Sequence, residues 1–556
     1  MQIKKYTCDV LVLGSGGAGC KCGIIASKND KKVIIVSKGL SFKSGCTMLA
    51  EGGYNAVFGY VDQADSLQLH ILDTLKGGAF LNDLHLVHEL VVESPKRLIE
   101  LESYGCLFDR QEDGTLNQRA FGGQTCKRTC FKGDQSGHEM MLGLKEAVIR
   151  ENIETHEEIM ITKLLFDKNH EKIVGAMGIS LKDSSIIVYN SKTTVIATGG
   201  CGWLYPVTSN AVQKTGDGMV MAYDAGADMM DMEMVQFHPT GMVSPKSRRG
   251  VLITEAVRGE GGHLINTDGE RFMKNYDSRE ELATRDVVAR AIYTEIQEGR
   301  GTPDGGVYLS VTHLPTQQVE TKLHTMVQQF KDVGIDIINE PMVVAPTAHH
   351  FMGGIRINGN CESNIKNLFA AGEVTSGVHG ANRLGGNALA DTQVFGNIAG
   401  IQASKRADEI DFEEIDEKEI NAEIERIKNI MTEGSINPSD IKNKIRNIMW
   451  KYVAIVRDEK GLKEAQKELE FLESELDDMD VDSHKEYNEK LVAALEVISM
   501  IKLAKLIVKS ALLRKESRGA HYRLDFPEKN DEEYLKSFIL NKNGNVSTVE
   551  RGLFED

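Results

Sequence analysis

A cluster of glycines near the start of the chain has the spacing that a phosphate-binding turn requires. Gly14, Gly16 and Gly19 form a G-x-G-x-x-G pattern between an apolar run at 10–13 and a helical pattern. Glycines so placed allow a tight turn and the close approach of a pyrophosphate, whose charge is met by the N-terminus of the next helix. Gly clusters also form plain turns, but the preceding strand favours a dinucleotide site at Gly14, Gly16, Gly17, Ala18 and Gly19.

The expected second strand lacks the acid that holds the ribose of a nicotinamide cofactor. It reads VIIVSKG, with Ser37 and Lys38 where Asp or Glu would stand. FAD fits better, because TVIATGG at 194–200 and LFAAGEV at 368–374 are two further segments shaped for it. Glu373 is predicted to accept a ribose hydroxyl of FAD; alternatively, its charge faces the dipole of its own helix. The FAD contacts predicted here are Ser37, Lys38, Ala197, Thr198, Gly199 and Glu373.

Composition and charge narrow the class of protein. The chain has 556 residues, 53 Gly, only 10 Pro and a formal net charge of −17. This length predicts several domains. The negative charge opposes binding to nucleic acid or to an anionic membrane surface. An acidic protein that binds a dianion must concentrate its cations locally, so clustered Arg and His are informative.

The apolar and cysteine patterns predict a cytoplasmic protein without direct membrane insertion. The chain start lacks the apolar segment and cleavage site of a signal peptide. No apolar run approaches the roughly 20 residues that a spanning helix needs. The nine Cys are scattered, which predicts reduced thiols. Neither Cys126 and Cys130 nor Cys20 and Cys22 have a matching second pair, so no metal site is expected in this chain.

The residue composition and the spacing of apolar residues change along the chain, and these changes predict a division into domains. Short β-branched runs alternate with Gly-rich turns and helical patterns over about the first 230 residues, as a βαβ-type sheet requires. Residues 408–515 are charged, Gly-poor and apolar at helical spacing, which predicts a helical bundle, either a solvated appendage or a docking module. The predicted division is a nucleotide-binding domain at 1–231 and 346–407, an inserted domain at 232–345, a helical domain at 408–518 and a C-terminal segment at 519–556.

A series of motifs in order along nearly the whole chain gives a specific resemblance. The motifs are CTMLAEGGYNA at 46–56, TGDGMVMAYDAGA at 215–227, QFHPTG at 236–241, LITEAVRGEGGHL at 252–264, ELATRDVVARAI at 281–292, PTAHHFMGGI at 346–355, GVHGANRLGGNAL at 377–389 and SRGAHYRLDFP at 517–527. In them the chain resembles the fumarate reductase and succinate dehydrogenase flavoprotein family, which also includes L-aspartate oxidase. The resemblance implies an α/β fold: a Rossmann-like FAD-binding domain with an inserted α+β capping domain, then a helical domain and a short C-terminal segment.

The resemblance also implies how FAD is held. In membrane-bound members, a His just before the A-Q-G-G run attaches to the flavin covalently. Aligned on Ala50, Gly52 and Gly53, that position is Cys46. We therefore expect noncovalent FAD, whose lower potential favours fumarate reduction; Cys46 is then a small apolar filler, and a cysteinyl link is the alternative. The implied FAD contacts are Ser44, Thr47, Gly52, Gly53, Asp217, Glu373, Asn387 and Leu389.

Fumarate and succinate carry a carboxylate at each end. Their site needs cationic donors at both ends and a proton donor beside the reacting carbon. By the resemblance, His238, His349 and Arg383 bind the carboxylates, with Thr254 as a further hydroxyl donor. The planar fork of Arg suits two carboxylate oxygens. His350 stays ambiguous, because it stands where the family often has Tyr.

The resemblance makes Arg285, in ATRDVVA, the proton donor to the substrate. An Arg acid is unusual, because its intrinsic pKa is above about 12, so it needs a relay that reprotonates it. In TEAVRGEGG, Glu255 and Arg258 are three residues apart, and the family uses that pair as the proton path. An ordinary ion-pair network of the three residues is the alternative.

With Cys46 at the position of the flavin-linking His, the chain also resembles the flavin subunits of thiol-driven fumarate reductases of methanogenic archaea. There an iron–sulfur partner oxidises coenzyme M and coenzyme B thiols and passes electrons to the flavin. This chain lacks cluster-binding Cys patterns, so an iron–sulfur partner is expected here too. Three alternatives stay open: a succinate dehydrogenase flavoprotein, L-aspartate oxidase and a noncatalytic assembly subunit. GGNALA at 385–390 is nearer the G-G-N-S-L form of the reductases than the A-S-N-S-L form usual in the oxidases.

Overall fold

A mixed sheet forms the centre of the computed structural model, which describes residues 2–552. Its order is β6-β2-β1-β9-β8-β7, and β16 also pairs with β9. The strands β6, β2, β1, β9 and β16 are parallel, whereas β7 and β8 are antiparallel to their neighbours. The VIIV run of β2 is buried at all four positions, as expected for a parallel strand covered on both faces. The bounds are β1 Ile3–Leu13, β2 Val33–Val36, β6 Glu154–His156, β7 Ile159–Phe166, β8 Ile173–Ser180, β9 Ile186–Ile196 and β16 Leu368–Ala370.

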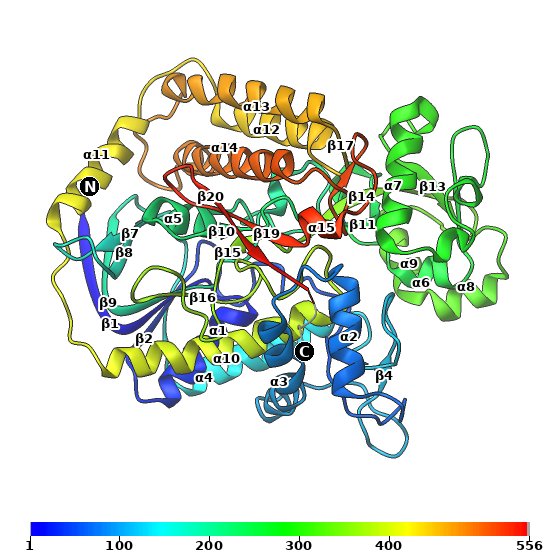
Figure 1. Cartoon of the computed structure of the whole chain (residues 1–556), viewed down its shortest axis with the longest axis horizontal. Helices are drawn as coiled ribbons and strands as arrows, with labels where there is room; N and C mark the ends of the chain where they lie inside the picture. The colour runs from blue at the N-terminus through cyan, green and yellow to red at the C-terminus, as the bar shows by residue number, and fades with distance from the viewer. Residues whose placement is uncertain (1, 553–556) are drawn as a thin grey trace.

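Two helices with glycine N-caps, Gly16 and Gly386, pack closely beside this sheet. A Cβ at Gly396 of α10 would lie 2.7 Å from the Ala18 carbonyl oxygen of α1, and one at Gly400 would lie 2.8 Å from that of Cys22. Only glycine allows this approach, which brings the two helices together near the first βα turn (Figure 1). The helices of this part of the chain are α1 Gly17–Lys28, α2 Leu67–Gly77, α3 Leu84–Ser103, α4 Ser136–Arg150, α5 Asp217–Ala225 and α10 Asn387–Asp408.

A second, antiparallel sheet with its own apolar core stands at one end of the molecule, drawn in green in Figure 1. Its order is β11-β14-β13-β12. Strand β14 runs across residue 345, where the inserted domain was predicted to end, and continues to the histidines at 349 and 350. The elements are β11 Val235–Met242, β12 His263–Ile265, β13 Val307–Ser310, β14 Met342–Phe351, α6 Glu255–Gly259, α7 Arg285–Glu295, α8 Thr316–Lys322 and α9 His324–Lys331.

The helices after residue 408 form a layer on the other side of the central sheet (Figure 1). Ile420 and Ile427 are two of the apolar residues at helical spacing within 408–515, and both are buried in α11. The chain then returns through β19 and β20, and β19 pairs with β10 of the first part of the chain. No helix among residues 2–552 is long and apolar enough to cross a membrane. The predicted α/β class with a helical region is confirmed; its elements here are α11 Glu417–Ile430, α12 Pro438–Tyr452, α13 Glu459–Ser474, α14 Glu489–Leu513, β10 Met229–Met230, β19 Lys536–Leu540 and β20 Val546–Glu550.

Candidate active site

A cavity of about 530 Å³ runs from the first βα turn to the histidines of the antiparallel sheet. It collects segments far apart in the sequence. Most of the residues predicted to contact FAD line it, namely Gly14, Gly16, Gly17, Ala18, Ser37, Lys38, Ser44, Thr47, Gly52, Gly53, Ala197, Thr198, Gly199, Asp217, Glu373 and Leu389.

The glycine turn has the close packing that its sequence predicts. Gly14 has φ +116°, and a Cβ there would lie 2.2 Å from the carbonyl oxygen of Ala197. A Cβ at Gly19 would lie 1.9 Å from the carbonyl oxygen of Gly14, so Gly19 packs helix against turn and does not line the cavity. Gly16 caps α1 without a side-chain hydrogen bond. The helix therefore presents backbone N–H groups to the cavity, which suits an anionic diphosphate.

Buried polar atoms without partners also fit a bound cofactor. Among the described residues, Thr198 Oγ1, Asp217 Oδ1 and Asp391 Oδ1 lack a hydrogen-bond partner and belong to residues that line the cavity. Such atoms are costly unless a ligand or water satisfies them. Hydroxyls and ring nitrogens of FAD would supply partners for these atoms.

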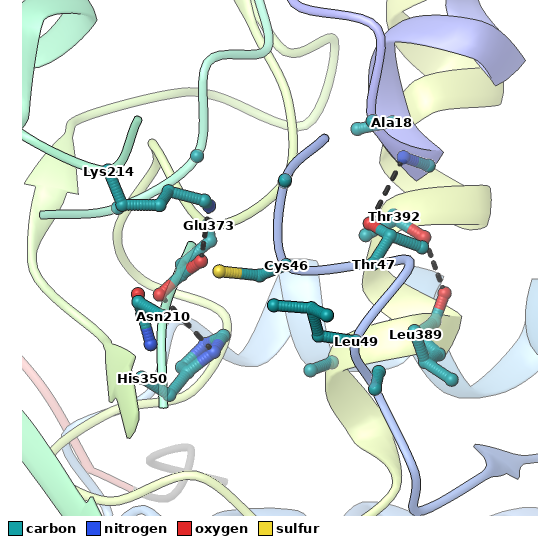
Figure 2. A pocket seen from close by; sticks show the side chains of 18 of the residues that line it. Ala18, Cys46, Thr47, Leu49, Asn210, Lys214, His350, Glu373, Leu389 and Thr392 are labelled. Carbon is teal, nitrogen blue, oxygen red and sulfur yellow. Dashed lines mark hydrogen bonds and ion pairs between the residues drawn. The ribbon is translucent and has the colours of Figure 1, made fainter. Parts of the chain in front are cut away.

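Both acids predicted to contact FAD are paired with lysines. Lys38 Nζ lies 2.6 Å from Asp217 Oδ2, and Lys214 Nζ lies 2.8 Å from Glu373 Oε2. Figure 2 shows the second pair beside Cys46, and it also shows Thr47, whose hydroxyl accepts the N–H of Gly17 at 3.1 Å. The cavity wall is therefore nearly neutral at these acids, which favours an anionic cofactor.

Asn387 points away from the cavity. Its side chain accepts a hydrogen bond from Asn55 at 2.7 Å, lies 2.9 Å from His70 Nε2 and donates to Thr74 at 3.0 Å. Asn387 is fully buried and does not line the cavity. Its side chain fixes the start of α10, whereas the neighbouring Leu389 lines the wall.

The residues predicted to bind the substrate meet at the other end of the cavity. His238 on β11, His349 on β14, Thr254 and Arg383 all line it. The imidazole rings of His238 and His349 lie with their centroids 5.8 Å apart. Gln236 accepts from Arg383 Nη2 at 3.0 Å and donates to its carbonyl oxygen at 2.9 Å, which holds the guanidinium in place.

The electrostatics of this end suit an anion. Burial, followed by Arg285, lowers the pKa of His238 well below its usual value, and burial with Arg383 does the same for His349. Both rings are therefore neutral and donate one N–H each. Burial and Arg285 lower the pKa of Arg383 to about 9, which leaves it charged at neutral pH. A carboxylate would relieve this crowding of positive charge.

Arg285, Glu255 and Arg258 form a chain of charges. Arg285 Nε and Nη2 lie 2.9 and 2.8 Å from Glu255 Oε2, and Glu255 Oε1 lies 4.0 Å from Arg258 Nη2. Burial raises the pKa of Glu255, but Arg285 and Arg258 hold it below its usual value. Arg285 and Glu255 line the cavity, while the buried Arg258 lies behind them. The geometry fits a relay that leads from the interior to the cavity.

Several cavity residues escaped the sequence prediction. Lys214, Ser209 and Asn210 line the wall, and Ser209 Oγ lies 2.9 Å from His349 Nδ1. The one available signal was the position of Lys214 directly before TGDG. His350, left ambiguous from sequence, also lines the cavity.

Comparisons with known proteins agree with this geometry. Residues 9–389 match the FAD binding domain family, and residues 442–551 match the fumarate reductase flavoprotein C-terminal family. The chain is 57% identical to a fumarate reductase (CoM/CoB) subunit of Methanothermobacter marburgensis, over 98% of each chain. It is 36% identical to a succinate dehydrogenase flavoprotein subunit of Rickettsia bellii, over 95% of this chain and 92% of the relative.

A solved structure gives the same result. Mycobacterium smegmatis Sdh1, solved in complex with UQ1, aligns with a TM-score of 0.92 and 36% identity, over 99% of this chain and 95% of that one. Identity at this level over whole chains, with both family matches, goes beyond a likeness of fold. The chain belongs to the fumarate reductase and succinate dehydrogenase flavoprotein family and is an FAD-dependent oxidoreductase acting on CH–CH bonds.

Proposed function

We propose that this protein reduces fumarate to succinate as the flavin-bearing subunit of a fumarate reductase. The observation that carries the proposal is the meeting of His238, His349, Arg383 and Arg285 at one end of the FAD cavity. Two neutral imidazole donors and two guanidinium ions match a flat molecule with a carboxylate at each end.

FAD supplies the hydride when bound, and the chain supplies orientation, charge and a proton. Arg383, braced by Gln236, holds one carboxylate, while His238 and His349 donate N–H groups to substrate oxygens. Thr254 adds a hydroxyl. Negative charge that develops on the substrate is stabilised by donors that are already in place, so no reorganisation is needed during the reaction.

Arg285 donates the proton. Its Nε and Nη2 are engaged by Glu255, which leaves Nη1 to face the substrate. Glu255, which is ionised at rest, accepts a proton from Arg258 and passes it to Arg285. Solvent then replaces the proton that Arg258 has given up. An Arg acid is effective only when its conjugate base is short-lived, and the contacts of 2.8 to 4.0 Å along this chain support fast return.

FAD is held noncovalently in this proposal. Burial raises the pKa of the Cys46 thiol, against the opposing effect of Lys214, so the sulfur is a poor nucleophile. Electrons come from a separate iron–sulfur subunit. The likeness to a component of a CoM/CoB fumarate reductase supports coenzyme M and coenzyme B thiols as the ultimate donors.

The test uses the purified holoprotein with reduced methyl viologen as an artificial donor. We expect viologen oxidation that depends on fumarate, and its loss in Arg285→Ala with FAD still bound. Succinate oxidation with a dye that exceeds fumarate reduction would favour a succinate dehydrogenase flavoprotein. Hydrogen peroxide from aspartate and oxygen would identify L-aspartate oxidase, and no turnover with any substrate would favour an assembly subunit.

The partner is tested separately. Purification of the complex from its natural source should yield a chain with bound iron–sulfur clusters, and coenzyme M and coenzyme B thiols together should reduce the flavin of that complex. Isolation of the protein alone, with full activity from a free reductant, would contradict the proposed partner.

A further inference from the structure

Lys214 and Glu373 form a buried ion pair in the cavity wall. Their Nζ and Oε2 atoms are 2.8 Å apart, and their side chains are only 9% and 11% exposed. Burial would lower the pKa of Lys214, but Glu373 holds it above the usual value, so the lysine is charged. Figure 2 shows the lysine extended across the wall to meet the carboxylate beside Cys46.

The two glycines after β9, Gly199 and Gly200, leave space for this pair because they have no side chain. A Cβ at Gly199 would lie 1.6 Å from Lys214 Nζ, and a Cβ at Gly200 would lie 2.6 Å from Glu373 Oε1. The Gly-Gly turn that follows the strand thus leaves the space in which the two charged groups lie. The pair is a built feature of the wall and not a chance contact of two surface side chains.

Among the described residues, Lys214 is the one Lys or Arg within ion-pair distance of Glu373; the charge of Arg383 also acts on Glu373, but from further away. Its Oε1 accepts the N–H of Phe351 at 3.2 Å and lies 3.7 Å from His350 Nδ1. Burial and Arg383 lower the pKa of His350 well below its usual value, so this imidazole is neutral. Of the described residues, Lys214 is therefore the cation in direct contact with this carboxylate.

The pair borders the substrate end of the cavity. His350 follows His349 on β14, and Asn210, four residues before Lys214, donates to the His349 carbonyl oxygen at 2.9 Å. The redox-active end of FAD must reach the substrate, so we expect this pair to lie near the flavin ring, whereas the sequence had predicted that Glu373 accepts a ribose hydroxyl. Reduction adds negative charge to the cofactor, and an unpaired carboxylate there would oppose it.

We propose that Lys214 is a positioning residue that neutralises Glu373 and thereby raises the midpoint potential of bound FAD. The inference rests on the proposed noncovalent site at this end of the cavity. It assigns to a lysine–carboxylate pair part of the control over potential that a covalent bond exerts in other members of the family.

The test is a redox titration of the holoproteins, followed by the flavin spectrum and performed without fumarate. We expect Lys214→Met to bind reduced FAD at least ~tenfold more weakly relative to oxidised FAD, which corresponds to a midpoint potential lower by ~30 mV. Lys214→Arg should restore the potential. Glu373→Gln should raise it, and the double variant K214M/E373Q should return it towards the wild-type value, because neither charge remains.

Lys38→Met is the matched control. Lys38 is also largely shielded from solvent, with its side chain 17% exposed, and it lies 2.6 Å from an acid; but its acid is Asp217, and Glu496 of α14 is its second partner. Its loss should weaken the binding of oxidised and reduced FAD alike and leave the potential unchanged. If a variant retains little FAD, the dissociation constants of the two oxidation states, measured by fluorescence titration, give the same ratio.

A wild-type midpoint potential in Lys214→Met would overturn the inference. So would a midpoint potential in K214M/E373Q that is as low as that of Lys214→Met. These outcomes do not depend on catalysis. A protein without fumarate turnover that still shows the expected potentials would contradict the proposed function and leave this inference intact.

Discussion

The two ends of the cavity are built from different kinds of chemical group. At the dinucleotide end, glycines and backbone N–H groups of the first strand, turn and helix shape the site, and other segments add lining residues such as Lys38 and Asp217. At the substrate end, charged and imidazole side chains arrive from β11, β14, α7 and the segment before α10. The first end should therefore be sensitive to added volume, and the second to chemical identity.

The largest effect is expected at the substrate end. Arg285→Ala should lower kcat for fumarate by ~10²–10⁴-fold, because it removes the proposed proton donor. The flavin spectrum and FAD content should not change, since Arg285 contacts Glu255 and not the glycine turn. Turnover is measured by viologen oxidation.

Arg279 provides the control for this change. It is a half-exposed arginine six residues earlier, and it pairs with Asp277 at 2.9 Å. Arg279→Ala should keep the activity within about twofold, the range of ±0.5 kcal/mol expected at a surface site. Equal losses in both variants would mean that the effect is not specific to the proton donor.

Glycines test the dinucleotide end, where the expected effect is on FAD affinity. A Cβ at Gly16 would lie 3.6 Å from Thr47 Oγ1, an ordinary contact, yet Gly16 lines the cavity. Gly16→Ala should fold normally without FAD and bind FAD ~10–100-fold more weakly, from about 1–3 kcal/mol of steric strain in the complex. Titration of the deflavinated protein, with its Tm measured beside it, checks both parts.

Gly19→Ala should lower the stability of the protein itself, in contrast to Gly16→Ala. Its Cβ would meet the Gly14 carbonyl oxygen at 1.9 Å, so the strain lies within the protein itself. The Tm without FAD should fall, which Gly16→Ala should not show. The same Tm for both variants would remove the distinction between a glycine that admits the cofactor and one that packs the helix.

Arg383→Lys tests whether the chemical identity of a side chain matters at the substrate end when its charge is kept. Lysine keeps the cation but loses the planar fork that Gln236 braces at 3.0 Å. We expect KM for fumarate to rise ~10-fold or more, the equivalent of about 1.5 kcal/mol for a charged hydrogen bond, with a smaller change in kcat. An unchanged KM would mean that only charge matters at this position.

The same contrast explains what the sequence could predict. The glycine turn was predictable because its spacing within six residues dictates its local geometry. The helices and the parallel strands were predictable because apolar periodicity reflects burial, as at Ile420 and Ile427 of α11. The roles at His238, His349 and Arg383 came from resemblance, since nothing local brings residues 238 and 349 within 5.8 Å.

The contacts that the sequence did not predict are made between residues far apart in the chain. Asn387 lies within a motif that implies FAD contact, but its amide is engaged by Asn55, His70 and Thr74, more than 300 residues away. The partner of Lys214 is 159 residues further along the chain. The sequence marks such residues as polar, but only the fold decides whether they face a ligand or each other.

The smallest effect concerns pH and a carboxyl in the cavity wall. Burial, and then Asp134, raise the pKa of Glu51 to about 7. Glu51 lines the cavity, so bound FAD would remove more water from it and favour its neutral form. The dissociation constant for oxidised FAD should therefore be constant below pH 7 and should rise above it, because the ionised carboxylate must take up a proton as FAD binds.

Two variants separate Glu51 from other titrating groups in this prediction. Glu51→Gln cannot ionise, so its FAD affinity should stay flat through pH 7 and match that of the wild type at low pH. Asp134→Asn removes a charge that raises the pKa of Glu51, and it should shift the inflection to lower pH. Fluorescence titrations from pH 6 to 8.5 measure both, and an unchanged slope in Glu51→Gln would assign the proton to another group, because no other change in that variant alters the charge of the wall.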